Sequence, residues 1–142
     1  METEGVAPSA KLSVFEERRK RSPGGKFLDG KEIQKWEGRR SGDMFATIPG
    51  VDLHRAGMKS FAAGSRATQS LRSSRAEPCY MDVYLDGALV YSKALVGAQL
   101  FDLNSIPASH LAAVEVYSSA ANIPPELNRT SKGCGVIALW TR

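Results

Sequence analysis

The last residues of the chain form the sequence feature that most limits its possible folds. Residues 135–141 are apolar at both sets of alternating positions. Because successive side chains of a strand point to opposite faces, a strand here would have no polar face to turn toward water. Such a strand belongs in the interior of a sheet. One set is Val136, Ala138 and Trp140, and the other is Ile137 and Leu139.

Further strands are expected upstream of this one. Residues 80–85 and 88–91 are strand-like and are separated by Asp86-Gly87. An Asp-Gly pair between two such runs predicts a tight hairpin, because both turn positions need positive φ. Residues 113–117 predict another strand. The side chains expected to share inner faces are Met81, Val83 and Leu85 in the hairpin, and Val114 and Val116 in the later strand.

The first helix is expected to begin at Ser13. Ser13 and Glu16 have the spacing of a capping box, in which the hydroxyl and the carboxylate bind free amides at the start of a helix. The Ser-Pro-Gly-Gly sequence at residues 22–25 ends this helix. Residues 1–12 lack periodicity and are read as a flexible lead-in.

Two more short helices are expected before residue 50. Asp29 and Glu32 repeat the capping-box spacing in front of a helix over residues 30–37. Ser41 can cap a third helix, which the Pro49-Gly50 pair ends. Short helices followed by strands indicate an α+β fold, with a small mixed β-sheet of about four strands.

The length of 142 residues suits one domain with a real core. We expect residues 1–25 to be a flexible lead-in with a short helix, and residues 26–142 to form the domain. Residues 55–78 are the least readable stretch, with one plausible strand near residues 59–63.

Positive charge is concentrated in the first half of the chain. Residues 1–78 carry 15 basic and 10 acidic side chains, net +5, whereas residues 79–142 carry 4 and 5, net −1. Basic runs occur at residues 18–21, 39–40 and 66–75. Such runs are usually solvated surface, and the alternative is a nucleic-acid-binding or other interaction domain. The predicted strands carry no basic and aromatic platform of the kind that single-strand binders use, so nucleic acid is the less favoured partner.

The sequence predicts no enzyme and no cofactor. His54 and His110 are the only near-neutral bases, and no nucleophile elbow, phosphate loop or zinc-protease motif occurs. Two Cys and two His scattered along the chain make no metal signature. No apolar run is long enough to span a bilayer, and no signal peptide is visible. The chain as written is therefore either cytoplasmic or a piece whose targeting segment lies elsewhere.

The two cysteines stand just before predicted strands, Cys79 before the first clear one and Cys134 before the last. If both strands begin at the same edge of the sheet, the sulfurs can form a disulfide. In the chain-entropy model a bridge closing about 55 residues contributes roughly 4 kcal/mol at most. The alternative is two unrelated buried thiols. A disulfide would imply an oxidising compartment.

Five segments, in order, resemble the plug domain of TonB-dependent outer-membrane receptors. They cover about residues 26–142, although residues 55–78 lack a match to that family's arginine-glycine strand and no coupling box precedes Ser13. The segments are FLDGKEI at residues 27–33, DMFATIPGV at 43–51, VYLDG at 83–87, LNSIP at 103–107 with VEVY at 114–117, and GVIALWTR at 135–142. The residues that carry the resemblance are Pro49, Gly50, Asp86, Gly87, Pro107, Glu115 and Gly135.

The resemblance implies a small plug that sits inside a receptor β-barrel and performs no covalent chemistry. It implies that a small-molecule ligand, which the sequence does not identify, binds at the outer face. It also implies a periplasmic energy-coupling protein that pulls on an N-terminal box, and a place at the outer membrane. The chain would be either a fragment of a receptor or a free-standing plug-like protein.

Overall fold

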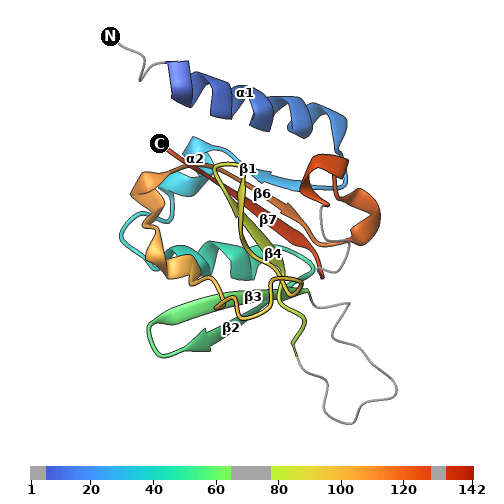
Figure 1. The fold of residues 1–142 in the computed structure, drawn as a ribbon. Coiled ribbons are helices and arrows are strands. Elements are labelled where there is room, and N and C mark those ends of the chain that lie inside the picture. Colours follow the sequence, from blue (N-terminus) through green and yellow to red (C-terminus); the bar gives the residue numbers. More distant parts are fainter. Residues whose placement is uncertain (1–5, 65–77, 129–133) are drawn as a thin grey trace.

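The computed structural model describes residues 6–64, 78–128 and 134–142. Figure 1 shows the arrangement of the elements. The helices are α1 (Val6–Arg21), α2 (Gly30–Gln34) and the 3-10 helices η2 (Ser41–Thr47), η3 (Leu103–Ser105), η4 (Ala108–His110), η5 (Ala120–Asn122) and η6 (Pro125–Leu127). The strands are β1 (Lys26–Leu28), β2 (Val51–Ala56), β3 (Lys59–Gly64), β4 (Asp82–Leu85), β5 (Ala88–Tyr91), β6 (Leu111–Tyr117) and β7 (Val136–Thr141).

Five of the strands form one mixed sheet in the order β1-β6-β7-β4-β5. Strand β7 lies in the middle, antiparallel to β6 and parallel to β4. This confirms the predicted α+β class and the interior position of the last strand. The sheet has five strands where about four were expected, and β2 and β3 form a separate two-stranded sheet.

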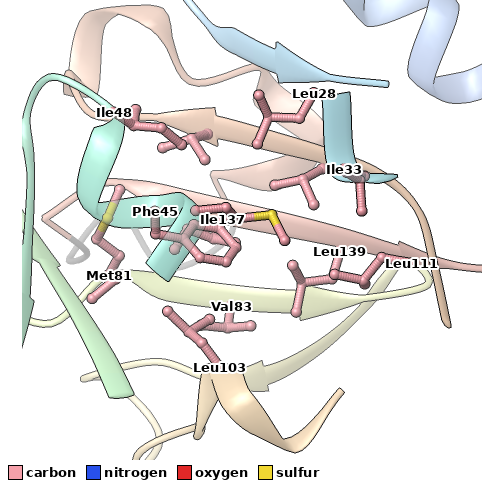
Figure 2. Close-up of a cluster of buried hydrophobic side chains, with 14 of the residues drawn as sticks. Leu28, Ile33, Phe45, Ile48, Met81, Val83, Leu103, Leu111, Ile137 and Leu139 are labelled. Carbon is pink, nitrogen blue, oxygen red and sulfur yellow. The ribbon is translucent and has the colours of Figure 1, made fainter. Parts of the chain in front are cut away.

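Strand β7 is buried on both faces, as its sequence predicts. Ile137 and Leu139 belong to the largest core cluster, together with Ile33, Phe45 and Ile48 from the α2 and η2 region (Figure 2). On the opposite face, Val136 and Ala138 join a second cluster and Trp140 a third. Figure 1 shows the corresponding layers, with α1 on one side of the sheet and the β2–β3 pair on the other.

The hairpin between β4 and β5 turns at the predicted Asp-Gly pair. Asp86 has φ +51° and Gly87 has φ +91°. Both values lie in the left-handed region, which a two-residue hairpin turn with the twist of its strands requires. Aspartate tolerates this conformation better than most residues, because its short side chain can form local hydrogen bonds.

Helix α1 begins at Val6, so the predicted start at Ser13 is wrong. The Ser13–Glu16 spacing therefore falls inside the helix and caps nothing. Pro8 contributed to the reading of this stretch as irregular. A proline is compatible with the first turn of a helix, because the amides there have no partner within the helix.

Of the other two predicted helix starts, the one at Asp29 is confirmed and the cap at Ser41 is wrong. The Asp29–Glu32 capping box is confirmed, with Glu32 N–H donating to Asp29 Oδ1 at 3.0 Å. Helix α2 nevertheless ends at Gln34, three residues earlier than expected. Ser41 does not cap the third helix. Its hydroxyl lies within hydrogen-bond distance of the carbonyl oxygens of Leu103 (2.9 Å) and Ile106 (2.6 Å), and so ties η2 to the η3–η4 segment.

Candidate functional site

Helix α1 is fastened to the sheet by a buried ion pair. Arg18 Nε donates to Glu115 Oε1 at 2.7 Å, and Arg18 Nη2 donates to Glu115 Oε2 at 3.0 Å. The Glu115 residue is fully buried in the middle of β6, and Arg18 is 4% exposed. Two parallel bonds between a guanidinium and a carboxylate fix the orientation as well as the distance of the partners. The pair therefore sets how α1 crosses the sheet.

Two aromatic side chains complete the surroundings of Glu115. The Tyr117 hydroxyl donates to Oε1 and the Trp140 indole N–H donates to Oε2, each at 2.6 Å. The Arg18 guanidinium also lies 5.6 Å from the centre of the Trp140 ring. The carboxylate thus receives four hydrogen bonds, which compensate for its removal from water. Phe15 of α1 packs beside Trp140 on the same face.

Burial and hydrogen bonding shift the pKa values in this cluster. Burial alone would lower the pKa of Arg18, but its hydrogen bonds to Glu115 and the charge of that carboxylate raise the pKa above the usual value. Burial, followed by the hydrogen bond to Glu115, raises the pKa of Tyr117. Arg18 therefore stays charged and Tyr117 stays a hydrogen-bond donor throughout the ordinary pH range.

A second carboxylate continues the network toward the surface. Glu126 Oε2 accepts from Arg18 Nη1 at 3.3 Å and from Arg21 Nη2 at 3.1 Å. Partial burial would raise the pKa of Glu126, but its backbone hydrogen bond and the two arginines lower it overall. Arg19 Nη1 lies 3.7 Å from Glu16 Oε2, and Arg19 Nη2 lies 3.7 Å from Asp29 Oδ2. Arg18 is therefore the one residue of the basic run at 18–21 that is not solvated surface, since Arg19, Lys20 and Arg21 are exposed.

The two cysteines form a disulfide. Their Cα atoms are 5.6 Å apart across a separation of 55 residues, which confirms the bridge over the alternative of two unrelated thiols. The geometry follows from the sheet, because β4 and β7 are parallel neighbours and each begins a few residues after its cysteine. The bridge thus joins the starts of two adjacent strands.

The other residues that carry the resemblance to plug domains lie in turns or next to the ends of helices and strands. Gly50 has φ +88° and directly precedes β2, and an added Cβ would collide with Ser118. Gly135 has φ +126°, and a Cβ there would lie 2.8 Å from the Tyr117 carbonyl oxygen. Pro49 also lines a hollow near Ser118, Pro107 precedes η4, and Asp86-Gly87 forms the hairpin turn. The structure does not gather these residues into one site, and their functional roles stay predictions.

The two histidines have structural surroundings. His54 Nε2 lies 3.4 Å from Asp52, and its ring meets the edge of Tyr80. His110 is exposed at the end of η4. Within the described ranges, no group of three or more His, Cys, Asp or Glu side chains is placed to hold a metal ion. No helix among those residues combines the length and apolar character needed to span a membrane.

The family profile described as TonB-dependent Receptor Plug Domain matches residues 25–124. No match was found among curated protein sequences.

Several solved receptors share the fold. A double mutant of the ferric enterobactin receptor PfeA from Pseudomonas aeruginosa has a TM-score of 0.56 at 20% identity, over 90% of this chain and 18% of the receptor. A mutant PfeA in complex with enterobactin has a TM-score of 0.51 at 18% identity, over 84% of this chain and 18% of the receptor. The siderophore receptor PirA from Acinetobacter baumannii has a TM-score of 0.50 at 18% identity, over 87% of this chain and 18% of the receptor. The chain thus spans about 18% of the length of these receptors, and by the extent of the family match it belongs to the TonB-dependent receptor plug domains.

Proposed function

We propose that residues 26–142 act as the plug of a TonB-dependent outer-membrane receptor, with a gating or ligand-binding role and no covalent chemistry. The observation that carries the proposal is the family match over residues 25–124, which covers most of this unit. The five-stranded sheet with β7 at its centre agrees with that assignment. In this proposal residues 1–25 are a separate lead-in whose helix α1 docks on the plug through Arg18.

The partners follow from the proposed role. A receptor β-barrel would surround the plug, and a periplasmic energy-coupling protein would act on the N-terminal side. The similar structures include siderophore receptors and a complex with enterobactin. Ferric siderophores are therefore the first ligands to test.

The disulfide supports a place on the periplasmic side of the outer membrane. Disulfides persist in oxidising compartments such as the periplasm and are rare in the reducing cytosol. The bridge between Cys79 and Cys134 is therefore expected to persist in the periplasm.

The test is to express the full natural reading frame in a Gram-negative host and to separate the cell fractions. We expect the protein in the outer-membrane fraction, with Cys79 and Cys134 closed to thiol reagents until a reductant is added. A cytosolic product with both thiols free would contradict the proposal.

The plugging role needs its own measurement. The purified receptor, with its barrel in the same or a separate chain, should be nearly impermeable in liposomes. Deleting residues 26–142 should open a pore and raise sugar uptake, whereas the exposed substitution Lys31→Gln should leave the liposomes closed. Equal permeability with and without residues 26–142 would contradict a plug.

The nucleic-acid alternative loses support from the ion pairs. Arg18, Arg19 and Arg21 all contact carboxylates, so this run presents little unpaired charge to phosphates. The run at residues 66–75 lies outside the described residues. Binding to a DNA oligonucleotide that weakens by several decades with added salt would revive the alternative.

A further inference from the structure

A hollow of about 420 Å³ is lined by residues from the segment before η2, the turn between β2 and β3, and the region of helix η3. None of the plug residues named above except Pro107 lines it. The lining residues are Arg39, Arg40, Ser41, Met58, Asp102, Asn104 and Pro107. Its volume is in the lower part of the range of about 300–1,000 Å³ found for small-molecule pockets.

The two arginines of this hollow differ from the other arginines of the described residues. Arg39 and Arg40 have no carboxylate within 4.0 Å among those residues, whereas each of the others has one. The shortest distances are 2.7 Å for Arg18, 3.7 Å for Arg19, 3.1 Å for Arg21, 3.0 Å for Arg55 and 3.7 Å for Arg142. Two adjacent positive charges therefore remain without an acidic partner in the part of the chain that the structure describes.

Uncharged neighbours hold both guanidinium groups. The Arg39 guanidinium lies 5.3 Å from the centre of the Trp36 ring, and Trp36 itself packs against the main core. Arg40 Nη2 lies 3.2 Å from Met58 Sδ on the β2–β3 turn. These contacts position the arginines without forming an ion pair within 4.0 Å, so their remaining N–H groups are available to an anion.

Asn104 and Asp102, which also line the hollow, belong to a hydrogen-bond network. Asn104 Oδ1 accepts from Gly42 N–H at 2.8 Å, while Asn104 Nδ2 donates to the Met58 carbonyl oxygen at 2.8 Å and to Ser60 Oγ at 3.0 Å. Asp102 Oδ1 accepts from the N–H groups of Ser60 and Asn104, each at 3.0 Å. This part of the lining is therefore held in place before any ligand binds, which lowers the ordering cost of binding.

We propose that this hollow binds a small hydroxylated molecule that carries a phosphate or carboxylate group. The planar guanidinium fork matches both anions, and two bonds per arginine give strength and orientation. Asp102 is the one carboxylate in the lining and repels an anion, so the opposite end of the ligand presents hydroxyl donors to it. This site stands on the geometry of the hollow and does not depend on the plug assignment.

The test is a titration of the 142-residue chain with glycerol 3-phosphate, followed by amide NMR shifts. We expect saturable shifts at Ser41, Gly42 and Asn104. The Arg39→Gln/Arg40→Gln variant should bind at least about tenfold more weakly, because it loses the charge-assisted hydrogen bonds. The matched control, Arg19→Gln/Arg55→Gln, removes the same charge from ion-paired arginines and should change the affinity less than about twofold.

Four outcomes would overturn parts or all of the proposal. No saturable shift at millimolar glycerol 3-phosphate would remove the site, and so would equal weakening in the control variant. Inorganic phosphate that binds as tightly as glycerol 3-phosphate would remove the role given to Asp102. A DNA oligonucleotide that displaces the probe and binds far more tightly, through the same two arginines, would replace the small molecule by nucleic acid.

Discussion

Replacing Arg18 by methionine tests how firmly helix α1 is docked. Methionine keeps an unbranched apolar stem like that of the arginine, but it is shorter and lacks the charge and the hydrogen bonds. In the described structure Arg18 is the one cation within 4.0 Å of Glu115. The variant would leave that carboxylate fully buried, with the Tyr117 hydroxyl and the Trp140 indole N–H as its donors.

The size of the effect follows from this burial. Removing one partner of a buried ion pair costs about 3–5 kcal/mol, because the other charge stays without compensation. A domain has a free energy of unfolding of about 5–15 kcal/mol, so the variant should lose a large fraction of its stability. With a urea slope of about 2 kcal/mol per molar, the unfolding midpoint should fall by roughly 2 M.

Urea denaturation at pH 7, followed by far-ultraviolet circular dichroism with the disulfide intact, measures this loss. Adding Glu115→Gln to Arg18→Met should restore at least about 1 kcal/mol, because no buried charge remains. The amide oxygen can accept from the Trp140 indole N–H, and the amide NH2 can donate to the Tyr117 hydroxyl, which also accepts hydrogen bonds. The control Arg19→Met changes an adjacent arginine with longer contacts, and should cost less than about 1 kcal/mol.

Two results would refute the reasoning. If Arg18→Met costs less than about 1 kcal/mol, the pair is worth no more than a surface contact and α1 is not fastened by it in solution. If the costs of Arg18→Met and Glu115→Gln simply add in the double variant, the two side chains do not act as a unit.

Three further predictions concern the same sheet. Trp140→Ala should cost about 3–5 kcal/mol in chemical denaturation, because the ring is 6% exposed and its N–H binds Glu115; a near-neutral result would mean that β7 is loosely packed. Replacing Cys79 and Cys134 by serine should cost up to roughly 4 kcal/mol relative to the oxidised protein, and an unchanged urea midpoint would count against the bridge. Partial burial would raise the pKa of Asp86, but hydrogen bonds from Thr141 and then the contact with Lys11 lower it overall. The stability that Asp86 contributes is therefore present above about pH 4 and is lost as the pH falls through the lowered pKa, so Asp86→Asn should flatten the unfolding free energy over this acidic range.

Elements with local signals could be predicted from the sequence. Strand β7 was recognisable because both of its faces are apolar, and the β4–β5 hairpin because Asp86 and Gly87 supply the positive φ that its turn needs. The Asp29–Glu32 capping box is similarly short-range. In each case the residues that decide the structure are neighbours along the chain.

The docking of α1 had no comparable signal. Arg18 and Glu115 are 97 residues apart, so a basic run at a helix end looked like ordinary surface. A hint was present, because Glu115 stands between Val114 and Val116 in an apolar strand and must find a partner when it is buried. The identity of that partner depends on how α1 crosses the sheet.

The hollow beside Arg39 and Arg40 also depends on contacts between residues that are far apart in the sequence. The sequence identified the basic pair, but its surroundings come from Met58 and Asp102, which are distant along the chain. Ser41 was expected to cap a helix, and instead its hydroxyl binds carbonyl oxygens of the η3–η4 segment. Tertiary contacts decided both features.

The disulfide also has a mechanical consequence. When the two ends of the chain are drawn apart, the covalent path passes directly from Cys79 to Cys134, so strands β4, β5 and β6 bear no tension. Only the residues outside that bypassed segment can be extended. Reduction would release about 55 more residues, or roughly 190 Å of extensible backbone. The redox state of one bond thus sets the greatest length to which this protein can be stretched.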